Sequence, residues 1–423
     1  MKIQAVRGTR DFYPEDMAFR RWLVERWREA SRRAGFVEVD GPELEPLELY
    51  TEKSGPEIAE QLYWLQDKGG RKLALRPEFT PTLARMIASR QAALPEPIRW
   101  FNISRCFRYE RAQKGRLREF FQWNVDLVGV PDEVADAECL SVAVEAMKGV
   151  GLGPEDVVVR LNDRRLLGAL VQHLGIAEPR VPQVFALLDK RDKVPALALA
   201  AMLAEAGLDT RQREGLERVL SWRHLSDIDA RERATPEVAA AVESLNRLFE
   251  LLKDYGVAEW CRFDIGIVRG LAYYTGPVWE VHDRQGEFRA IFGGGRYDRL
   301  LGDVGGKPMP ACGFGCGDVI LGLLLEARGL RPEPERAADY YVVQADAVAW
   351  AEVLQVVRHL RGRGHPTQFD LKGGALKRQM KKAADAAARF VVILSDGFAA
   401  DRRVTIRDMQ SGEQRDLPLE NLG

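Results

Sequence analysis

The residues with the clearest chemical potential lie between Ile98 and Gly129, in two strand-like segments joined by a basic loop. In the second segment, alternation gives one apolar face and one mainly polar face. The polar face carries Arg118, Phe120, Gln122, Asn124 and Asp126. In the first segment, Cys106, Arg108 and Glu110 share a face. Arginine forms a bidentate fork on phosphate or carboxylate, and amides and carboxylates on a rigid strand suit a donor-bearing side chain. The pattern favours a small polar ligand with phosphates at one end over the alternative, a solvated sheet face beside a charged loop.

A second candidate segment is Leu75 to Thr82, where a strand meets the start of a helix. Thr80 is predicted as the N-cap of that helix, with Pro81 at its first position. The carboxylate of Glu78 would then lie near the ends of the sheet and could hold an ammonium group. An exposed loop acid is the alternative for Glu78.

A third candidate segment is Val268 to Gly276, in which two glycines bracket the pair Tyr273 and Tyr274. Glycine permits close approach of the backbone to a ligand. The glycine triplet at 293–295 follows downstream and leads into Arg296. By itself this glycine pattern indicates no particular ligand.

Composition and missing motifs narrow the function. The 423 residues carry a net charge of −1, with 30% charged and 46% hydrophobic residues, which is typical of a soluble globular protein of two to four domains. A nucleic-acid partner would need a local basic surface. There is no P-loop, convincing Rossmann fingerprint, HExxH pair or serine-hydrolase elbow.

The five cysteines and the absence of a long apolar run indicate the cytoplasm and no membrane contact. Cys312 and Cys316 have no second pair, so a structural role is favoured over zinc, and no metal site is predicted in the protein itself.

The apolar periodicity divides the chain into regions. Helices are expected at Met17–Ala34 and Pro81–Arg90, and strands near 36–39, 62–66, 72–75 and 100–107. Residues 151–258 read as mostly helical, with helices at 194–206 and 236–255. Strands return at 262–269, 278–282 and 288–292 before a linker at 331–336. The final region alternates strands at 340–343, 367–371 and 390–394 with helices at 347–363 and 375–387, then ends in a hairpin turning at 411–412. This alternation indicates a separate small α/β domain.

At this point the motifs resemble a known family. The segment from Phe107 to Gln122 is similar to motif 2 of class II aminoacyl-tRNA synthetases, and residues 269–276 are similar to the signature of histidyl-tRNA synthetases. The segments 6–11, 75–78 and 293–298 resemble that family in the same order, and Gly41-Pro42 resembles motif 1, which forms the dimer interface in the family. The similarity spans nearly the whole chain.

The resemblance implies an α+β fold: a class II antiparallel sheet core flanked by helices, formed by residues 1–150 and 259–330. It also implies a mostly helical insertion at 151–258 and a C-terminal α/β anticodon-binding-like domain at 337–423. The implied reaction is activation of histidine with ATP, accompanied by Mg²⁺, and charging of tRNA(His) by a homodimer.

The same resemblance implies roles for individual residues. Glu78 and Thr80 would hold the histidine amino group. The side chains around the substrate and its imidazole would be Gln122, Asp126, Tyr273 and Tyr274. Arg269 would be the catalytic arginine, and Arg108 would contact the α-phosphate and carboxylate. Glu110 would lie by ATP or its magnesium, and Arg116 would join the ATP-binding residues. A basic stripe for tRNA is formed by Lys377, Arg378, Lys381 and Lys382.

The sequence departs from the family pattern at four positions. Ile320 stands where motif 3 usually has an arginine, so either another cation, such as Arg296 or Arg116, neutralises the ATP tail, or activation is impaired. Ala272 replaces the usual acid of the signature, Asp126 a glutamate, and Phe121 a histidine that alternation would place on the apolar face.

These departures keep an alternative open: the histidine-binding regulatory subunit of ATP phosphoribosyltransferase, which does not charge tRNA. Its members usually lack the C-terminal domain that this sequence carries.

Overall fold

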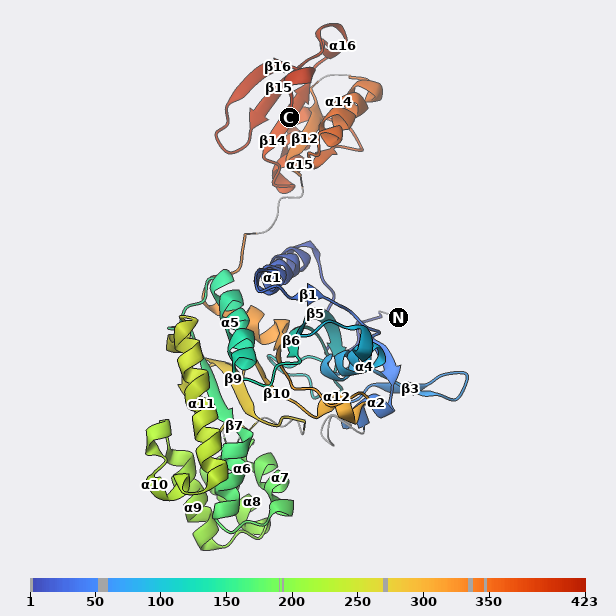
Figure 1. The fold of residues 1–423 in the computed structure, drawn as a ribbon. Helices are drawn as coiled ribbons and strands as arrows, with labels where there is room; N and C mark the ends of the chain where they lie inside the picture. Colours follow the sequence, from blue (N-terminus) through green and yellow to red (C-terminus); the bar gives the residue numbers. More distant parts are fainter. Residues whose placement is uncertain are drawn as a thin grey trace. The chain divides into compact units, whose positions relative to one another are not determined.

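The computed structural model describes residues 3–51, 60–189, 191, 194–268, 273–333, 338–345 and 348–423. Contacts between residues divide the chain into two compact units, residues 1–332 and 333–423 (Figure 1). Each unit has its own hydrophobic clusters. They are therefore described separately.

The first unit is built on an eight-stranded sheet with the order β1-β5-β6-β11-β10-β9-β7-β8. In that order the strands are β1 (Val37–Glu38), β5 (Ile98–Phe107), β6 (Glu119–Val128), β11 (Ala311–Gly317), β10 (Phe292–Arg296), β9 (Pro277–Asp283), β7 (Val157–Asp163) and β8 (Cys261–Phe263). Every pairing from β5 through β7 is antiparallel, and only the outermost strands, β1 and β8, pair in parallel. The predicted antiparallel core is confirmed.

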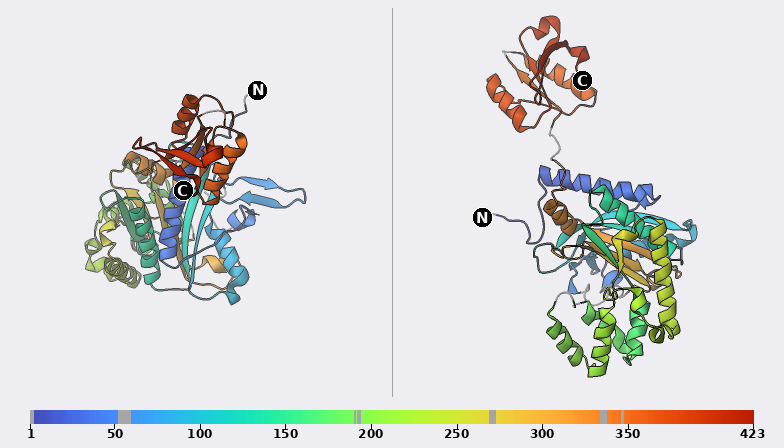
Figure 2. Two further views of the ribbon diagram at one scale, coloured as in Figure 1. Left: turned by 90° about the horizontal axis from the view of Figure 1, so that it is seen from above. Right: turned by 90° about the vertical axis from the view of Figure 1, so that its left-hand side faces the viewer.

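One face of this sheet is covered by helices α1 (Pro14–Arg33), α5 (Val134–Gly149) and α13 (Asp318–Ala327) (Figure 2). The odd-numbered residues of β6 point into this layer, where Trp123 stacks on Trp27 of α1 with 5.9 Å between ring centroids. Helix α1 begins three residues earlier than predicted, because Pro14 fits the first turn and the Tyr13 N–H donates to Asp16 at 3.4 Å.

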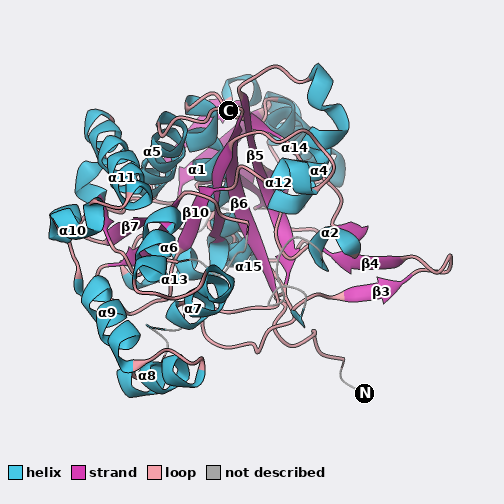
Figure 3. Cartoon of the chain, turned by 60° about the horizontal axis from the view of Figure 1, so that its bottom comes forward, coloured by secondary structure: helices cyan, strands magenta, loops and turns pink. Residues whose placement is uncertain are grey.

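The opposite face holds a second cluster under α4 (Thr80–Arg90) and α12 (Leu300–Asp303). Beside it lies a small antiparallel sheet of β2 (Leu44–Pro46), β4 (Lys72–Leu75) and β3 (Trp64–Gln66), with α2 (Glu48–Thr51) nearby. The β3–β4 hairpin projects from the body of this unit (Figure 3). This second face carries the even-numbered side chains of β6.

The region between β7 and β8 is helical and has its own core. It contains α6 (Arg164–His173), α7 (Val181–Leu188), α8 (Ala196–Glu205), α9 (Thr210–Ser221), α10 (Ala230–Arg233) and α11 (Pro236–Asp254). The range 151–258 is predicted to be mostly helical, but its first part contains a strand, β7, at Val157–Asp163. That strand pairs with β9 and belongs to the central sheet. A buried run such as Val157–Val159 fits a strand and a helix equally well by periodicity.

The glycine triplet also lies differently from the prediction. The sequence predicts a strand at 288–292 that ends in the glycine triplet, whereas β10 begins at Phe292 and runs through all three glycines to Arg296. A Cβ on Gly294 would lie 2.2 Å from the Gly313 carbonyl oxygen. Glycine is required inside this strand because neighbouring backbone approaches too closely for a side chain.

The second unit has a five-stranded sheet in the order β13-β12-β14-β15-β16. The strands are β12 (Tyr340–Gln344), β13 (Thr367–Phe369), β14 (Phe390–Leu394), β15 (Arg403–Asp408) and β16 (Gln414–Pro418). Helices α14 (Trp350–Gly362) and α15 (Leu376–Asp385) pack on different clusters of the sheet, and α16 (Phe398–Asp401) is a single turn. The predicted alternation of strands and helices is confirmed.

Short 3₁₀ turns complete the secondary structure: η1 (Gln91–Ala93), η2 (Glu178–Arg180), η4 (Leu225–Asp227), η5 (Ala258–Trp260) and η6 (Leu419–Asn421). Among the helices that the structure describes, none has the length and apolar character needed to cross a membrane.

Candidate active site

Asp126 lies at the centre of the predicted polar face. Its side chain is 2% exposed on β6, and one carboxylate oxygen accepts a hydrogen bond from the hydroxyl of Tyr297. The neighbouring strand makes room for it, since a Cβ on Gly313 would lie 2.5 Å from the same carboxylate oxygen. The other oxygen, Oδ2, is buried and has no partner among the described residues.

Glu78 is a second buried carboxylate on the same side of the sheet. Its Oε2 accepts a hydrogen bond from the Tyr273 hydroxyl at 3.0 Å, and its Oε1 is buried without a partner among the described residues. The Tyr273 ring contacts Tyr274 and Tyr297, with centroids 5.0 and 5.9 Å apart. The structure therefore brings together Glu78, Asp126 and both predicted tyrosines.

Burial shifts the pKa of Asp126. It raises the pKa of Asp126 to about 7, with Glu78 adding to the rise and the Tyr297 hydrogen bond opposing it. A second carboxylate in the same dry site disfavours the charged form of Asp126. An NH-bearing ligand would relieve both effects by donating to the unpartnered oxygens.

Thr80 is placed close to this pair but not in the predicted role. Helix α4 begins at Thr80 itself, and Phe79 occupies the N-cap position without a side-chain cap. The predicted capping role is therefore wrong, because residue 79 already has a helical backbone, with φ −92° and ψ −24°. This leaves Thr80 as the first helical residue, two positions after Glu78.

Gln122 shares the polar face with Asp126, as alternation predicts. Its Oε1 accepts a 3.6 Å contact from the Cys106 thiol, and its amide lies against the backbone of Gly315. The Gly315 position is close enough that a Cβ there would lie 2.1 Å from Gln122 Nε2.

Arg108 follows β5 directly and is held from two sides. Its Nε donates to the Pro77 carbonyl at 2.9 Å, and its guanidinium lies 5.2 Å from the Phe120 ring centroid. No carboxylate of the described residues forms an ion pair with it. The guanidinium is therefore held at Pro77, the residue before Glu78, where the sequence predicts a phosphate-binding group.

Glu110 and Arg116 form a pair across the predicted basic loop. Glu110 is buried, and the loop is closed by an isolated bridge between Gln113 and Arg116. Arg269, the predicted catalytic arginine, lies outside the described residues.

Ile320 lies on α13, where the missing motif 3 arginine would stand, and its Cδ1 is 2.5 Å from the Cβ position of Gly115. The suggestion that Arg296 replaces this cation is wrong. Arg296 forms a buried ion pair with Asp136 and also donates to the Val130 and Asp132 carbonyls. Its donors are used inside the fold.

Phe121 lies on the face opposite the candidate site, as alternation predicts. Its ring contacts Phe12 at 5.8 Å and the guanidinium groups of Arg20 and Arg105 at 4.6 and 5.1 Å. A histidine is not available at the substrate face from this position.

In the second unit, the predicted basic stripe lies on α15. Lys377, Arg378 and Lys381 are exposed, whereas Lys382 forms a 2.7 Å ion pair with the buried Asp370. Lys377 and Lys381 are one helical turn apart and present their charges on the same side.

Tyr297 is the site residue whose role was missed from the sequence. It is fully enclosed, and burial beside Asp126 raises its pKa well above the usual value, so it stays a hydrogen-bond donor. Its position directly after the glycine strand is the only signal in the sequence, and the strand's true register was needed to use it.

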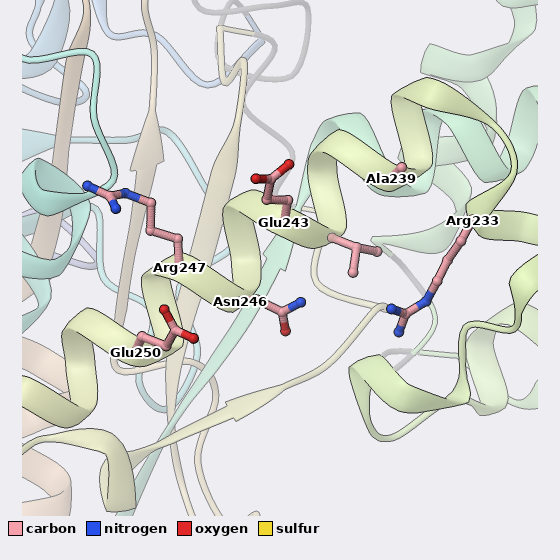
Figure 4. Close-up of a pocket in the computed structure, with 7 residues that line it drawn as sticks. Arg233, Ala239, Glu243, Asn246, Arg247 and Glu250 are labelled. Atoms are coloured by element: carbon pink, nitrogen blue, oxygen red, sulfur yellow. The ribbon is translucent and has the colours of Figure 1, made fainter.

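A surface pocket of about 410 Å³ lies elsewhere, along α11 (Figure 4). It is lined by Arg233, Ala239, Val242, Glu243, Asn246, Arg247 and Glu250. Arg247 pairs with Asp132 and Glu133, and none of the predicted site residues lines this pocket.

The antiparallel sheet, the motif 2 hairpin that carries Arg108 and the glycine-lined polar face define a class II aminoacyl-tRNA synthetase. A family model described as histidyl-tRNA synthetase matches residues 8–317, and one described as an anticodon binding domain matches residues 341–423. The chain belongs to the histidyl-tRNA synthetase family.

Similar proteins agree with this assignment. The chain is 40% identical to the chloroplastic/mitochondrial histidine--tRNA ligase of Arabidopsis thaliana, over 99% of this chain and 86% of that protein. It is also 40% identical to the histidine--tRNA ligase of Opitutus terrae, over 99% and 97%.

Two solved structures share the fold. Histidyl-tRNA synthetase from Nostoc sp. PCC 7120 matches with a TM-score of 0.83 at 24% identity, covering 99% of this chain and 98% of that one. A protein from Bacillus halodurans, described as an ATP phosphoribosyltransferase regulatory subunit/histidyl-tRNA synthetase, matches with a TM-score of 0.76 at 25% identity, covering 93% and 98%.

Proposed function

We propose that this chain activates histidine with ATP, forming histidyl-adenylate, and transfers the histidyl group to tRNA(His). The observation that carries the proposal is the pair of buried carboxylates, Glu78 and Asp126. Each is held by a tyrosine hydroxyl through one oxygen and has a second oxygen without a partner among the described residues. Such a pair suits a ligand with an NH donor at each end, as histidine has in its ammonium group and its imidazole.

The proposed substrate contacts follow from these positions. Glu78 and Thr80 bind the amino end, while Asp126 and Gln122 receive the imidazole from the floor of the sheet. Tyr273 and Tyr274 form the wall. Asp126 is one methylene shorter than the family's usual glutamate. The hydrogen bond from the Tyr297 hydroxyl fixes the orientation in which its carboxylate would accept the imidazole N–H.

Arg108 and Arg269 serve the chemical step in this proposal. A histidine carboxylate oxygen attacks the α-phosphorus of ATP, a new P–O bond forms, and the bond to the β-phosphate breaks with loss of pyrophosphate. Fixed positive charge that faces the developing negative charge lowers the barrier without a covalent enzyme intermediate.

The nucleotide and its Mg²⁺ would be held by the motif 2 loop. Glu110 and Arg116 form an ion pair in the described structure, so binding of the polyphosphate would have to exchange that pair for contacts with the metal and the phosphates. The acidic and basic partners that such an exchange needs are both present, which supports ATP and Mg²⁺ as ligands.

The second unit is proposed to bind tRNA through α15, with contributions from Lys377, Arg378, Lys381 and Lys382. Residues 1–150 and 259–330 would form the catalytic core, with the insertion at 151–258 between them, the linker at 331–336 and the anticodon-binding domain at 337–423.

A homodimer is part of the proposal. The Gly41-Pro42 segment lies between the edge strands β1 and β2, and an apolar side chain is exposed on each of these strands, Val37 on β1 and Leu44 on β2. Apolar strand edges of this kind are usually covered by a partner. The cytoplasm is the proposed compartment, supported by five free cysteines.

The test is ATP–pyrophosphate exchange with each amino acid in turn, followed by aminoacylation of tRNA(His). We expect histidine to be the one amino acid that supports pyrophosphate exchange, and we expect the chain to charge tRNA(His) with it. The alternative, a regulatory subunit of ATP phosphoribosyltransferase, is favoured by Ile320 and by one half of the description of the Bacillus halodurans protein. Histidine binding with neither activity would establish that alternative.

Arg269 is tested separately. Arg269→Ala is expected to lose on the order of 10²-fold in adenylate formation, as when one preorganised donor is removed. An unchanged rate would show that its assignment is wrong.

A further inference from the structure

The junction of β7 and α6 contacts the segment at 265–268, which leads into the histidyl-tRNA synthetase signature. Asn162 is fully buried at the end of β7, and its Nδ2 donates to the carbonyls of Ile265 at 2.9 Å and Ile267 at 2.8 Å. One side-chain amide thereby fixes two backbone groups of the turn that follows β8. A buried bond of this type is costly to lose, because the carbonyls would remain desolvated.

Arg164, two residues later, contacts both sides of the signature. Its backbone N–H donates to the Gly276 carbonyl at 3.1 Å, and its Nη1 donates to the Val268 carbonyl at 3.2 Å. Val268 and Gly276 directly flank residues 269–275. One residue therefore contacts both described ends, through its side chain at Val268 and through its backbone at Gly276.

The surroundings of Arg164 are built to hold it in this place. Its guanidinium lies 5.1 Å from the ring centroid of Phe185, on helix α7. Burial lowers the pKa of Arg164, and the nearby Tyr274 opposes that change. Burying a guanidinium costs free energy, so its retention beside the substrate wall needs a role that a neutral side chain would not fill.

The next residue, Arg165, has a different environment and serves as a natural control. Its guanidinium pairs with Asp163 and donates to Ser244 on α11 at 3.0 Å. Arg165 thus joins α6 to α11, and these contacts do not reach the described part of the signature segment.

We propose that Arg164, supported by Asn162, is a positioning residue that holds Val268 and Gly276, the described residues at the two ends of the signature. It acts through the backbone carbonyls of Val268 and Gly276. The inference rests on the proposed function in assigning catalysis to Arg269. It also gives the helical insertion a part in catalysis, because Arg164 is the first residue of α6 and lies on Phe185 of α7.

The kinetic test compares Arg164→Ala, Arg164→Lys and Arg165→Ala in histidine-dependent pyrophosphate exchange. A displacement of about 1 Å in a catalytic group can cost about 10²-fold. We expect kcat of Arg164→Ala to fall by roughly that factor, while KM for ATP changes less than about threefold. Arg164→Lys should recover at least about tenfold, since an ammonium group can still donate to the Val268 carbonyl.

Arg165→Ala should keep its kcat within about threefold of the original chain, because its contacts lie on the other side of α6. A full rate in Arg164→Ala, or an equal loss in Arg165→Ala, would overturn the proposal.

A second measurement does not depend on activity. Hydrogen–deuterium exchange of the substrate-free full chain should be at least about tenfold faster in peptides covering 265–276 for Arg164→Ala, with unchanged exchange in β5 and β6. Faster exchange throughout the first unit would indicate general destabilisation, and unchanged exchange at 265–276 would show that Arg164 does not hold the segment. Either result would refute the positioning role. A further outcome is faster local hydrogen exchange although the original chain shows no histidine-dependent pyrophosphate exchange. In that case the proposed function is wrong, while the role of Arg164 in holding the segment is supported.

Discussion

At the scale of single residues, the site depends on two acids that are expensive to bury. Glu78 and Asp126 each receive one tyrosine hydroxyl, which satisfies half of each carboxylate. The remaining oxygens explain why the pKa of Asp126 is raised to about 7, since burial outweighs the single hydrogen bond. Such a site is more stable with a donor-bearing ligand than without one.

This arrangement predicts that Asp126 lowers the free energy of unfolding, and that it does so more strongly as pH rises. Its pKa is about 3.8 when unfolded and about 7 when folded, so the folded state binds the extra proton and loses stability as pH rises through that window. Relative to the original chain, Asp126→Asn should gain about 2 kcal/mol in free energy of unfolding between pH 5.5 and 7. Urea unfolding of both chains, without histidine, measures this difference. A difference that stays constant with pH would contradict the raised pKa.

Arg108 gives a second prediction at this scale. Its guanidinium is positioned by the Pro77 carbonyl and the Phe120 ring without an ion pair to a described carboxylate. Arg108→Ala is expected to lower kcat of histidine-dependent pyrophosphate exchange by about 10²–10³-fold. Arg105→Ala is the control, since Arg105 lies on β5, three residues before Arg108, and contacts Phe121 on the other face of the sheet. Equal losses in the two variants would mean that charge on β5, rather than the position of Arg108, matters.

Sequence reasoning identified the polar face through period-two alternation, which fixes the side of a strand on which each residue lies. It could not identify Tyr297 as the partner of Asp126, because that contact joins positions 171 residues apart. Arg296 was misassigned for the same reason: its partner Asp136 lies on another element, α5. Side-chain pairing across elements depends on register, which alternation alone does not give.

At the scale of elements, β10 and β11 form the glycine-rich floor behind the site. Gly313 and Gly315 of β11 lie opposite Asp126 and Asn124 of β6. Side chains at these positions would occupy the space of Asp126 and Gln122. The glycines therefore let two polar side chains lie flat against a neighbouring strand.

Gly294→Ala is expected to destabilise the first unit, because its Cβ would meet the backbone oxygen of Gly313 at 2.2 Å. Overpacking of this kind typically costs roughly 1–3 kcal/mol. Gly317→Ala is a matched control on the partner strand, where a Cβ would have nothing within 4 Å. Thermal unfolding should show a clearly lower Tm for Gly294→Ala only. Similar Tm values for the two variants would contradict the close approach of β10 and β11.

Helix α15 carries the prediction for tRNA. Lys377 and Lys381 are exposed, so they are available for phosphate contacts, whereas Lys382 is engaged by Asp370. The double variant Lys377→Gln and Lys381→Gln should lower kcat/KM for tRNA by roughly tenfold and reduce its salt dependence. Pyrophosphate exchange should be unchanged.

The control carries the same charge change on the first unit, Lys148→Gln with Lys253→Gln. Equal losses of tRNA charging in the two double variants would indicate a general effect of net charge rather than a binding surface on α15.

At the scale of the whole molecule, the order of regions followed from the sequence because the linker at 331–336 is polar and rich in proline. Periodicity also separated the helical insertion from the strands on either side. It did not place β7 in the central sheet, since Val157–Asp163 returns to pair with β9, more than a hundred residues later. Long-range strand order of this kind needs the packed structure.

The division into two units predicts how catalysis and tRNA charging separate. The first unit contains Glu78, Asp126 and Arg108 together with its own hydrophobic clusters, and the second contains α15 and separate clusters. A chain that ends at Pro332 should therefore fold and keep histidine-dependent pyrophosphate exchange within about threefold of the full chain. Its kcat/KM for tRNA should fall by at least about 10²-fold, because the phosphate contacts of α15 are lost. Exchange activity that disappears from a folded truncated chain would show that the second unit also shapes the adenylation site, and undiminished charging would remove α15 from tRNA recognition.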